Sequence, residues 1–256
     1  MIIAIDVGNS NVVIGTLEGH KVLTSARVLT KRDATAYEIA MDVKSALEFN
    51  KVKIEEAEGA IISSVVPSVT EALRQALKLI GIKRVLVVGS GIKTGLNIKI
   101  DDPAQLGADL AVGAVAGLAL EEAPMIIIDM GTATTVTAIA PDRSFIGGAI
   151  IPGVVLSMNA LANGASLLPN VPITAPKKTI GTNTVECMQS GAVVGAAAMM
   201  DGLIERFEEE MGCSCKVLAT GGLSRFVVPI CKRKDIRLEP DLLLLGLAEI
   251  WEKNRK

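Results

Sequence analysis

The sequence predicts an α/β protein built from two related halves. Apolar runs of strand length alternate with segments of helical periodicity, which is typical of largely parallel sheets covered by helices. Half of the 256 residues are apolar, and most of these are Ala, Val, Ile and Leu, as expected for strands buried on both faces. A motif that begins at Asp6 recurs at Asp129, which divides the chain into two similar parts.

The repeated motif is an apolar strand that ends in Asp-x-Gly and small polar residues. IIAIDVGNSNVV begins at Ile2, and MIIIDMGTATTV begins at Met125. Each is followed by a polar turn and another strand, so each half starts with a hairpin of one design. Glycine lets backbone N–H groups approach an anion, and a carboxylate can hold a cation or its water beside a phosphate. Two such loops facing each other across a cleft are suited to binding a nucleoside triphosphate.

The remaining elements follow in alternation after each hairpin. Helical periodicity predicts helices, and short apolar runs closed by turn residues predict buried strands. No low-complexity linker separates the halves, so we expect the boundary within residues 115–124. The expected helices are 35–49, 69–79, 109–120, 184–211 and 241–254, and the expected strands include 59–66, 84–89 and 216–220.

Composition argues against several classes of protein. A net charge of −2 and an aromatic content of 2% give no reason to expect a nucleic-acid partner. No uninterrupted apolar run approaches the roughly 18 to 20 residues of a membrane span. Asp6 and Asn9 interrupt the first apolar segment before a signal peptide could form, and the four cysteines lack metal-ligand spacing. We therefore expect a cytoplasmic protein that acts on a small molecule.

The paired loops resemble those of the actin-like superfamily of sugar kinases, acetate kinases and Hsp70-type ATPases. This resemblance implies two related actin-like (ribonuclease H-like) lobes with an ATP cleft between them. The N-terminal lobe would span residues 1–117 and carry the first phosphate loop. The C-terminal lobe would span residues 118–256 and carry the second phosphate loop and a helix for dimerisation.

A more specific resemblance, to type III pantothenate kinases, covers nearly the whole chain. Several of the matching segments are weak alone, but the ordered set is specific. The segments are DVGNSN (6–11), SSVVP (63–67), GAD (107–109), DMGTATT (129–135), GGAIIPG (147–153), GTNTVECMQSG (181–191) and ATGG (219–222).

The pantothenate kinase resemblance implies ATP-dependent phosphorylation of the primary hydroxyl of pantothenate, the first step of coenzyme A biosynthesis. Asp109 would accept the hydroxyl proton, Asp129 would coordinate K⁺ or NH₄⁺, and Asp6 would hold Mg²⁺ through water. Thr184 would reach the substrate of the other subunit in a homodimer. The nucleotide would contact Asp6, Val7, Gly8, Asn9, Ser10, Asn11, Val12, Val13 and Thr132, and the acceptor would contact Ile100, Gly107, Ala108, Asp109, Leu110 and Thr184.

Several of these residues also have a structural interpretation. Asp109 is suited to the first turn of a helix, where the helix dipole favours an acid. Thr184 competes with Thr182 and Asn183 for the N-cap of the following helix. The glycines of GGAIIPG and ATGG can serve as turns without contacting a ligand.

The chain departs from the family pattern where the acceptor would bind. The family usually has Gly-Ala-Asp-Arg, whereas this chain has Leu110 in place of the arginine. Ile100 replaces a common tyrosine, Asp102 replaces an asparagine, and Ser10 replaces a threonine. Leucine cannot replace an arginine that matches a carboxylate. Three functions therefore remain open: a pantothenate kinase with a rebuilt acceptor pocket, a kinase for another small molecule, and a non-catalytic ATP-binding regulator.

Overall fold

The computed structural model describes residues 1–255, which form two compact units. Unit 1 comprises Met1–Leu96, Asp101–Leu120 and the C-terminal segment from Asp241, and unit 2 comprises Asn97–Ile100 and Glu121–Pro240. This grouping differs from a single division after residue 117 in three places, the first being that residues 118–120 belong to unit 1. The C-terminal helix packs on the first sheet, and residues 97–100 contribute an edge strand to the second.

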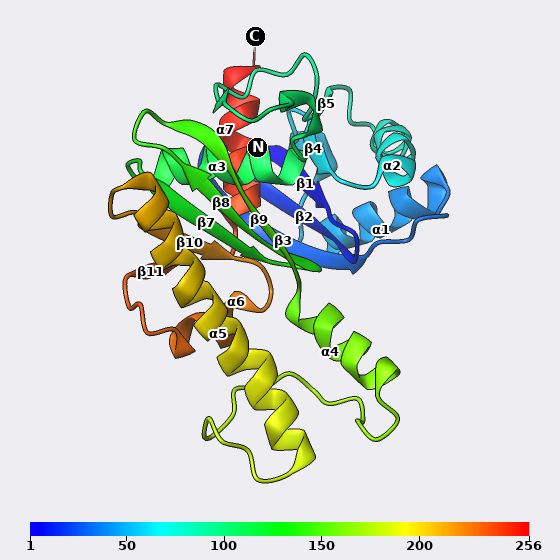
Figure 1. Ribbon diagram of the computed structural model, residues 1–256. Coiled ribbons are helices and arrows are strands. Elements are labelled where there is room, and N and C mark those ends of the chain that lie inside the picture. The colour runs from blue at the N-terminus through cyan, green and yellow to red at the C-terminus, as the bar shows by residue number, and fades with distance from the viewer. Residues whose placement is uncertain (256) are drawn as a thin grey trace. The chain divides into compact units, whose positions relative to one another are not determined.

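Unit 1 contains a five-stranded sheet with the order β3-β2-β1-β4-β5 (Figure 1). The hairpin strands β1, β2 and β3 are antiparallel, whereas β4 and β5 run parallel to β1. The bounds are Ile2–Val7 for β1, Asn11–Glu18 for β2, Lys21–Leu29 for β3, Ala60–Ser64 for β4 and Val85–Val87 for β5.

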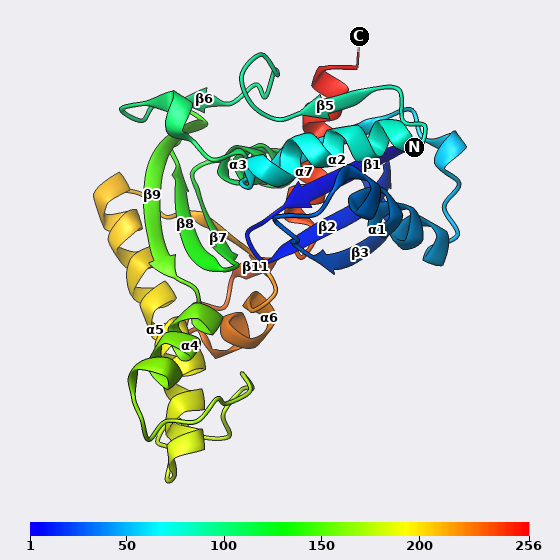
Figure 2. The same ribbon diagram turned by 90° about the vertical axis from the view of Figure 1, so that its right-hand side faces the viewer.

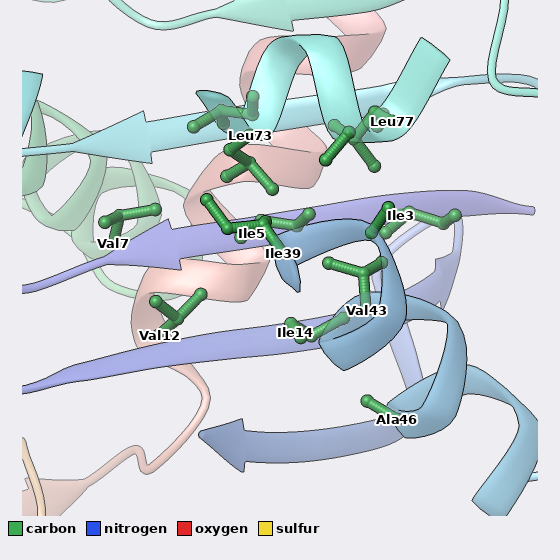
Figure 3. Close-up of a cluster of buried hydrophobic side chains, with 14 of the residues drawn as sticks. Ile3, Ile5, Val7, Val12, Ile14, Ile39, Val43, Ala46, Leu73 and Leu77 are labelled. Carbon is green, nitrogen blue, oxygen red and sulfur yellow. The ribbon is translucent and has the colours of Figure 1, made fainter. Parts of the chain in front are cut away.

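Helices cover both faces of this sheet. Ile3, Ile5 and Val7 of β1 point toward α1 (Ala36–Phe49) and α2 (Pro67–Leu79), as Figure 3 shows. Ile2 and Ala4 belong to the opposite core, with α3 (Ala108–Leu120) and α7 (Leu242–Lys253). Because side chains alternate along a strand, Asp6 lies on the face of α3 and α7.

The two helices on that second face pack unusually closely. A Cβ atom at Gly246 of α7 would lie 2.2 Å from the backbone oxygen of Val112 in α3. Only glycine permits this approach, and Trp251 of α7 is buried in the same core. This packing explains why the C-terminal helix belongs to unit 1.

Unit 2 repeats the strand order of unit 1 (Figure 2). The strand order β9-β8-β7-β10-β11 has three antiparallel strands, β9, β8 and β7, followed by β10 and β11, which run parallel to β7. The short strand β6 pairs with β9 and forms the edge of the sheet on that side. The predicted internal repeat is therefore confirmed. The bounds are Asn97–Ile98 for β6, Met125–Met130 for β7, Ala133–Ile139 for β8, Ser144–Pro152 for β9, Lys216–Thr220 for β10 and Ile236–Leu238 for β11.

The long helix α5 (Thr184–Met211) covers one face of the second sheet. By length and composition it would also pass as a membrane span. However, Val193, Ala197 and Met200 are buried in the core of unit 2, which is the behaviour of a core helix. The other helices of this unit are α4 (Val154–Gly164) and α6 (Ser224–Val227), and a short 3₁₀ turn lies at Val228–Ile230. Unit 1 contains two such turns, at Ile54–Glu56 and Pro103–Gln105.

Candidate active site

The first Asp-x-Gly loop is a tight, braced turn. Gly8 N–H donates to the backbone oxygen of Asn11 at 3.0 Å, which closes the turn between β1 and β2. The Thr30 hydroxyl donates to the Gly8 oxygen at 2.7 Å, and Arg32 donates to Asn9 Oδ1 at 3.0 Å. Thr30 and Arg32 follow β3 and were not predicted from the sequence, because their role depends on the β2–β3 pairing.

Asp109 lies in the first turn of α3, on the face of the sheet that also carries Asp6. Its Oδ1 accepts a hydrogen bond from the backbone N–H of Leu110 at 2.8 Å. A Cβ atom at Gly107 would lie 2.5 Å from the same Oδ1, so the glycine makes room for the folded-back carboxylate. Burial raises the pKa of Asp109, although the backbone hydrogen bonds oppose this rise. A carboxylate of raised pKa is better suited to accept a proton.

The second Asp-x-Gly loop is enclosed by two glycines from other segments. A Cβ atom at Gly153 would lie 2.3 Å from the oxygen of Thr132, and one at Gly221 would lie 2.6 Å from Asp129 Oδ1. Gly221 also has a φ of +87°, which L-residues rarely adopt. The Gly153 N–H donates to the Thr132 oxygen at 3.1 Å. Both glycines therefore shape the loop that carries Asp129 and Thr132.

The two loops differ by one residue in length. Val7 pairs with Val12 across the first turn, whereas Met130 pairs with Thr134 across the second. Asp6 therefore pairs with Val13, and Asp129 pairs with Thr135. When the two motifs are aligned on their aspartates, Val13 corresponds to Val136, so the two strand pairings differ by one residue.

We expect Gly153→Ala to destabilise the protein by several kcal/mol, because the added methyl group would overlap backbone atoms of the second loop. Gly202→Ala is the control, since a Cβ atom at this helical site meets only the flexible end of Arg206 at 3.6 Å. It should stabilise the protein by roughly 0.5–1 kcal/mol. Denaturant unfolding measures both changes, and equal stability of the two variants would contradict the packing argument.

Thr184 does not cap α5. Asn183 is the N-cap, and its side chain accepts from the N–H of Glu186 at 3.0 Å. The Thr182 hydroxyl donates to Glu186 Oε2 at 3.1 Å. The helix start is therefore satisfied by neighbours of Thr184, which remains exposed.

Thr184 lines a groove of about 930 Å³ between α4 and α5, together with Met158, Leu161 and Gly191. Figures 1 and 2 show that α4 and the N-terminal half of α5 project beyond the second sheet. Exposed large apolar side chains lie on these helices, namely Val155, Leu156, Leu161 and Val185, and Leu167 and Ile180 are exposed in the segment that connects the helices.

The residues that replace the family's acceptor contacts are placed as follows. Leu110 is half-buried in the first turn of α3, and Ile100 is half-buried in unit 2. Asp102 caps the 3₁₀ turn at Pro103, since its Oδ1 accepts from Ala104 N at 3.0 Å. Lys99 pairs with Asp142, and this contact, followed by that of Ser144, lowers the pKa of Asp142 to about 2. Lys99 is therefore already paired and is a poor substitute for the missing arginine.

Comparison with known proteins places the chain in a family. The sequence pattern of type III pantothenate kinases matches residues 2–206. A type III pantothenate kinase of Exiguobacterium sp. (strain ATCC BAA-1283 / AT1b) is 42% identical over the full length of both chains, and one of Exiguobacterium sibiricum is 43% identical, also over both full lengths. The chain belongs to the type III pantothenate kinase family. As a member of a kinase family it uses ATP and a divalent cation.

Solved structures of low sequence identity share the fold. A protein described as a conserved putative Baf family transcriptional activator from Campylobacter jejuni has a TM-score of 0.62 at 16% identity, covering 99% of both chains. Component A of the (R)-2-hydroxyglutaryl-CoA dehydratase of Acidaminococcus fermentans has a TM-score of 0.58 at 15% identity, covering 100% of this chain and 99% of its own. These likenesses confirm the actin-like α/β fold of this pantothenate kinase family member.

Proposed function

We propose that this protein transfers the γ-phosphoryl group of ATP to the primary hydroxyl of pantothenate in the cytoplasm, the first step of coenzyme A biosynthesis. Full-length similarity to type III pantothenate kinases supports this function. The observation that carries it is Asp109, a half-buried carboxylate of raised pKa in the first turn of α3. An assay of ATP consumption with and without pantothenate tests the proposal. A lack of pantothenate-dependent ATP consumption in the presence of Mg²⁺ and K⁺ would refute it.

In this proposal, Asp109 accepts the proton of the substrate hydroxyl as its oxygen attacks the γ-phosphorus. Gly107 and Ala108 leave room for the acceptor beside Asp109. The first loop, from Asp6 to Val13, and Thr132 of the second loop hold the nucleotide phosphates through backbone N–H groups and small polar side chains. The reaction is mainly a matter of positioning and charge neutralisation, which these loops are suited to provide.

The oxygen donors near the loops fit hard cations. Among residues 1–255, no three or more His, Cys, Asp or Glu side chains form a metal site. Mg²⁺ in kinases is bound by one or two carboxylates, with waters and substrate phosphates completing its coordination. Asp6 would hold Mg²⁺ through water, and Asp129 would hold K⁺ or NH₄⁺. Bound cations would neutralise phosphate charge.

We expect activity to depend on K⁺ or NH₄⁺ and to be poorly supported by Na⁺. Asp129→Ala should weaken ATP binding roughly tenfold, because the phosphates would lose a neutralising partner. Asp241→Ala, at the start of α7, is the matched control and should leave binding unchanged. Calorimetry measures nucleotide binding by the two variants, and a kinase assay in potassium and in sodium buffer measures the dependence of activity on the cation. Equal activity in both buffers would remove the monovalent cation from the proposal.

We further propose that two copies of the chain form a homodimer through α4 and the N-terminal half of α5. The exposed apolar side chains of these helices support this assembly, since monomers rarely expose contiguous apolar surfaces of this kind. Thr184 lies in the groove on this surface. It would reach the substrate held by Asp109 of the other subunit.

A mixture of Asp109→Asn and Thr184→Ala chains tests this shared site. In a mixed dimer, one site carries both defects and the other carries neither. Random reassociation of equal amounts should therefore restore about a quarter of wild-type activity, although each variant alone is impaired. Activity no higher than the mean of the two variants would place both residues in one subunit's site.

Leu110 and Ile100 support a second candidate, a kinase for a less anionic alcohol. The pocket would then lack the positive charge that pantothenate's carboxylate requires. A screen of pantothenate and related hydroxy compounds for ATP turnover separates the two functions. A non-catalytic nucleotide-binding regulator is disfavoured, because it would have no use for the proton acceptor Asp109.

A further inference from the structure

Ser63 of β4 is a fully buried serine whose hydroxyl has no hydrogen-bond partner within residues 1–255. Such a group lowers stability, because it loses its bonds to water without replacement. Native proteins rarely retain one without a function, particularly where alanine would fit. The site of Ser63 therefore requires an explanation.

The sheet register places Ser63 directly beside Asp6. The two residues are partners in the parallel pairing of β1 and β4, and neighbouring strands lie about 4.8 Å apart. Ile61, two residues earlier in β4, belongs to the core under α3 and α7, so Ser63 is on that face. Asp6 lies on the same face. The two side chains are thus neighbours at the end of β1.

Unit 2 repeats this pairing. Thr220 of β10 is the parallel partner of Asp129 of β7, and it is also buried, with 3% exposure. Both units therefore place a hydroxyl residue beside the aspartate that ends the first strand of the hairpin. Serine and threonine share only the hydroxyl and a small size, which indicates that the hydroxyl itself is used.

The next residue, Ser64, has a structural role instead. Its Oγ accepts from the backbone N–H of Val66 at 3.1 Å and from the Thr70 hydroxyl at 2.7 Å. It faces the opposite side of the sheet and secures the start of α2. Two adjacent serines thus differ in that one hydroxyl is bonded and the other is not.

We propose that Ser63 is a positioning residue for Asp6. When one carboxylate oxygen of Asp6 binds the water shell of the divalent cation, the Ser63 O–H donates to the other and fixes the carboxylate. In this proposal the serine side chain would adopt the staggered rotamer that forms this bond, which is strong because its acceptor is charged. The inference rests on the proposed function, which supplies the cation and ATP, and it deepens the role given to Asp6.

Ser63→Ala tests this role through binding of a non-hydrolysable ATP analogue, titrated with Mg²⁺. The Mg²⁺ concentration for half-maximal analogue binding should rise roughly tenfold, the effect of one lost hydrogen bond to a charged group. Analogue binding without Mg²⁺ should stay unchanged. The Tm of the ligand-free protein should be equal or slightly higher, because the removed hydroxyl had no partner.

Two variants complete the test. Ser64→Ala should lower the Tm, because it removes the hydrogen bonds that the Ser64 hydroxyl makes with Val66 and Thr70, and should leave the Mg²⁺ requirement unchanged. Ser63→Thr keeps the hydroxyl and should restore the Mg²⁺ requirement toward wild type. A wild-type Mg²⁺ requirement in Ser63→Ala overturns the proposal, whatever the Tm, and so does a raised requirement that Ser63→Thr does not correct. Because no acceptor is present, a failure of the wild type to phosphorylate pantothenate would refute the proposed function without affecting this measurement.

Discussion

Asp109→Asn should lower turnover by roughly 10² to 10⁴-fold while ATP binding persists. Asparagine keeps the size of the side chain and an oxygen that can accept the Leu110 N–H, but it cannot take up the substrate proton. Steady-state kinetics and nucleotide calorimetry measure the two effects separately. Asp101→Asn, an exposed acid in the preceding loop, is the matched control and should remain fully active.

Although Asp109→Asn should lower turnover, we do not expect it to lower the stability of the protein at neutral pH. Burial raises the pKa of Asp109 in the folded protein, so the folded state binds this proton more tightly than the unfolded state does. The charged group therefore costs stability above the raised pKa, and this cost disappears as the pH falls below the unfolded value of 3.8. At neutral pH, Asp109→Asn should be as stable as the wild type or more stable.

The pH dependence of catalysis follows from the same shift. Asp109 must be ionised to accept a proton, so kcat/KM should fall at acidic pH through a pKa above the usual aspartate range. Near-wild-type turnover in Asp109→Asn would assign the proton acceptor elsewhere, and Asp6 would be the next candidate.

Much of the fold was predictable because its signals are local. Strand alternation and the Asp-x-Gly turn define each hairpin within about twenty residues, and the helices 36–49 and 184–211 agree with the expected periodicity. Assignment of residues 97–100 and 241–255 to their units was not predictable, because it depends on packing between distant segments. Nothing near Gly246 in the sequence indicates that it contacts Val112.

The candidate site likewise has residues that local motifs identify and features that only the three-dimensional structure provides. Asp6, Asp109 and Asp129 were identified from motifs, and their proposed roles remain to be tested. The raised pKa of Asp109 follows from burial, and the bracing of the first loop by Thr30 and Arg32 follows from the strand pairing. The choice of Asn183 as N-cap depends on backbone geometry, since Thr182, Asn183 and Thr184 are all residues that favour this position.

Leu110→Arg should lower the KM for pantothenate at least thirtyfold with little change in kcat. This is the lower end of the effect of an uncompensated charged contact, on the order of 2 to 5 kcal/mol. Leu110 follows the proposed proton acceptor directly, and its side chain is partly exposed at the start of α3. An arginine here would bind the substrate carboxylate, away from the reacting hydroxyl. It would therefore stabilise the ground state and the transition state equally, which changes KM alone.

Leu110→Met is the matched control, because it keeps the apolar character and the approximate volume, so KM should not change. The arginine should cost little stability: a cation in the first turn of a helix is unfavourable by about 0.3–1 kcal/mol. The Leu110 N–H that binds Asp109 belongs to the backbone and is retained. If another basic residue already binds the carboxylate, a second positive charge would repel it, and KM would stay level or rise. Lys99 is a weak candidate for that role because it is paired with Asp142, so such a result would indicate Lys93 or a basic group from the partner subunit.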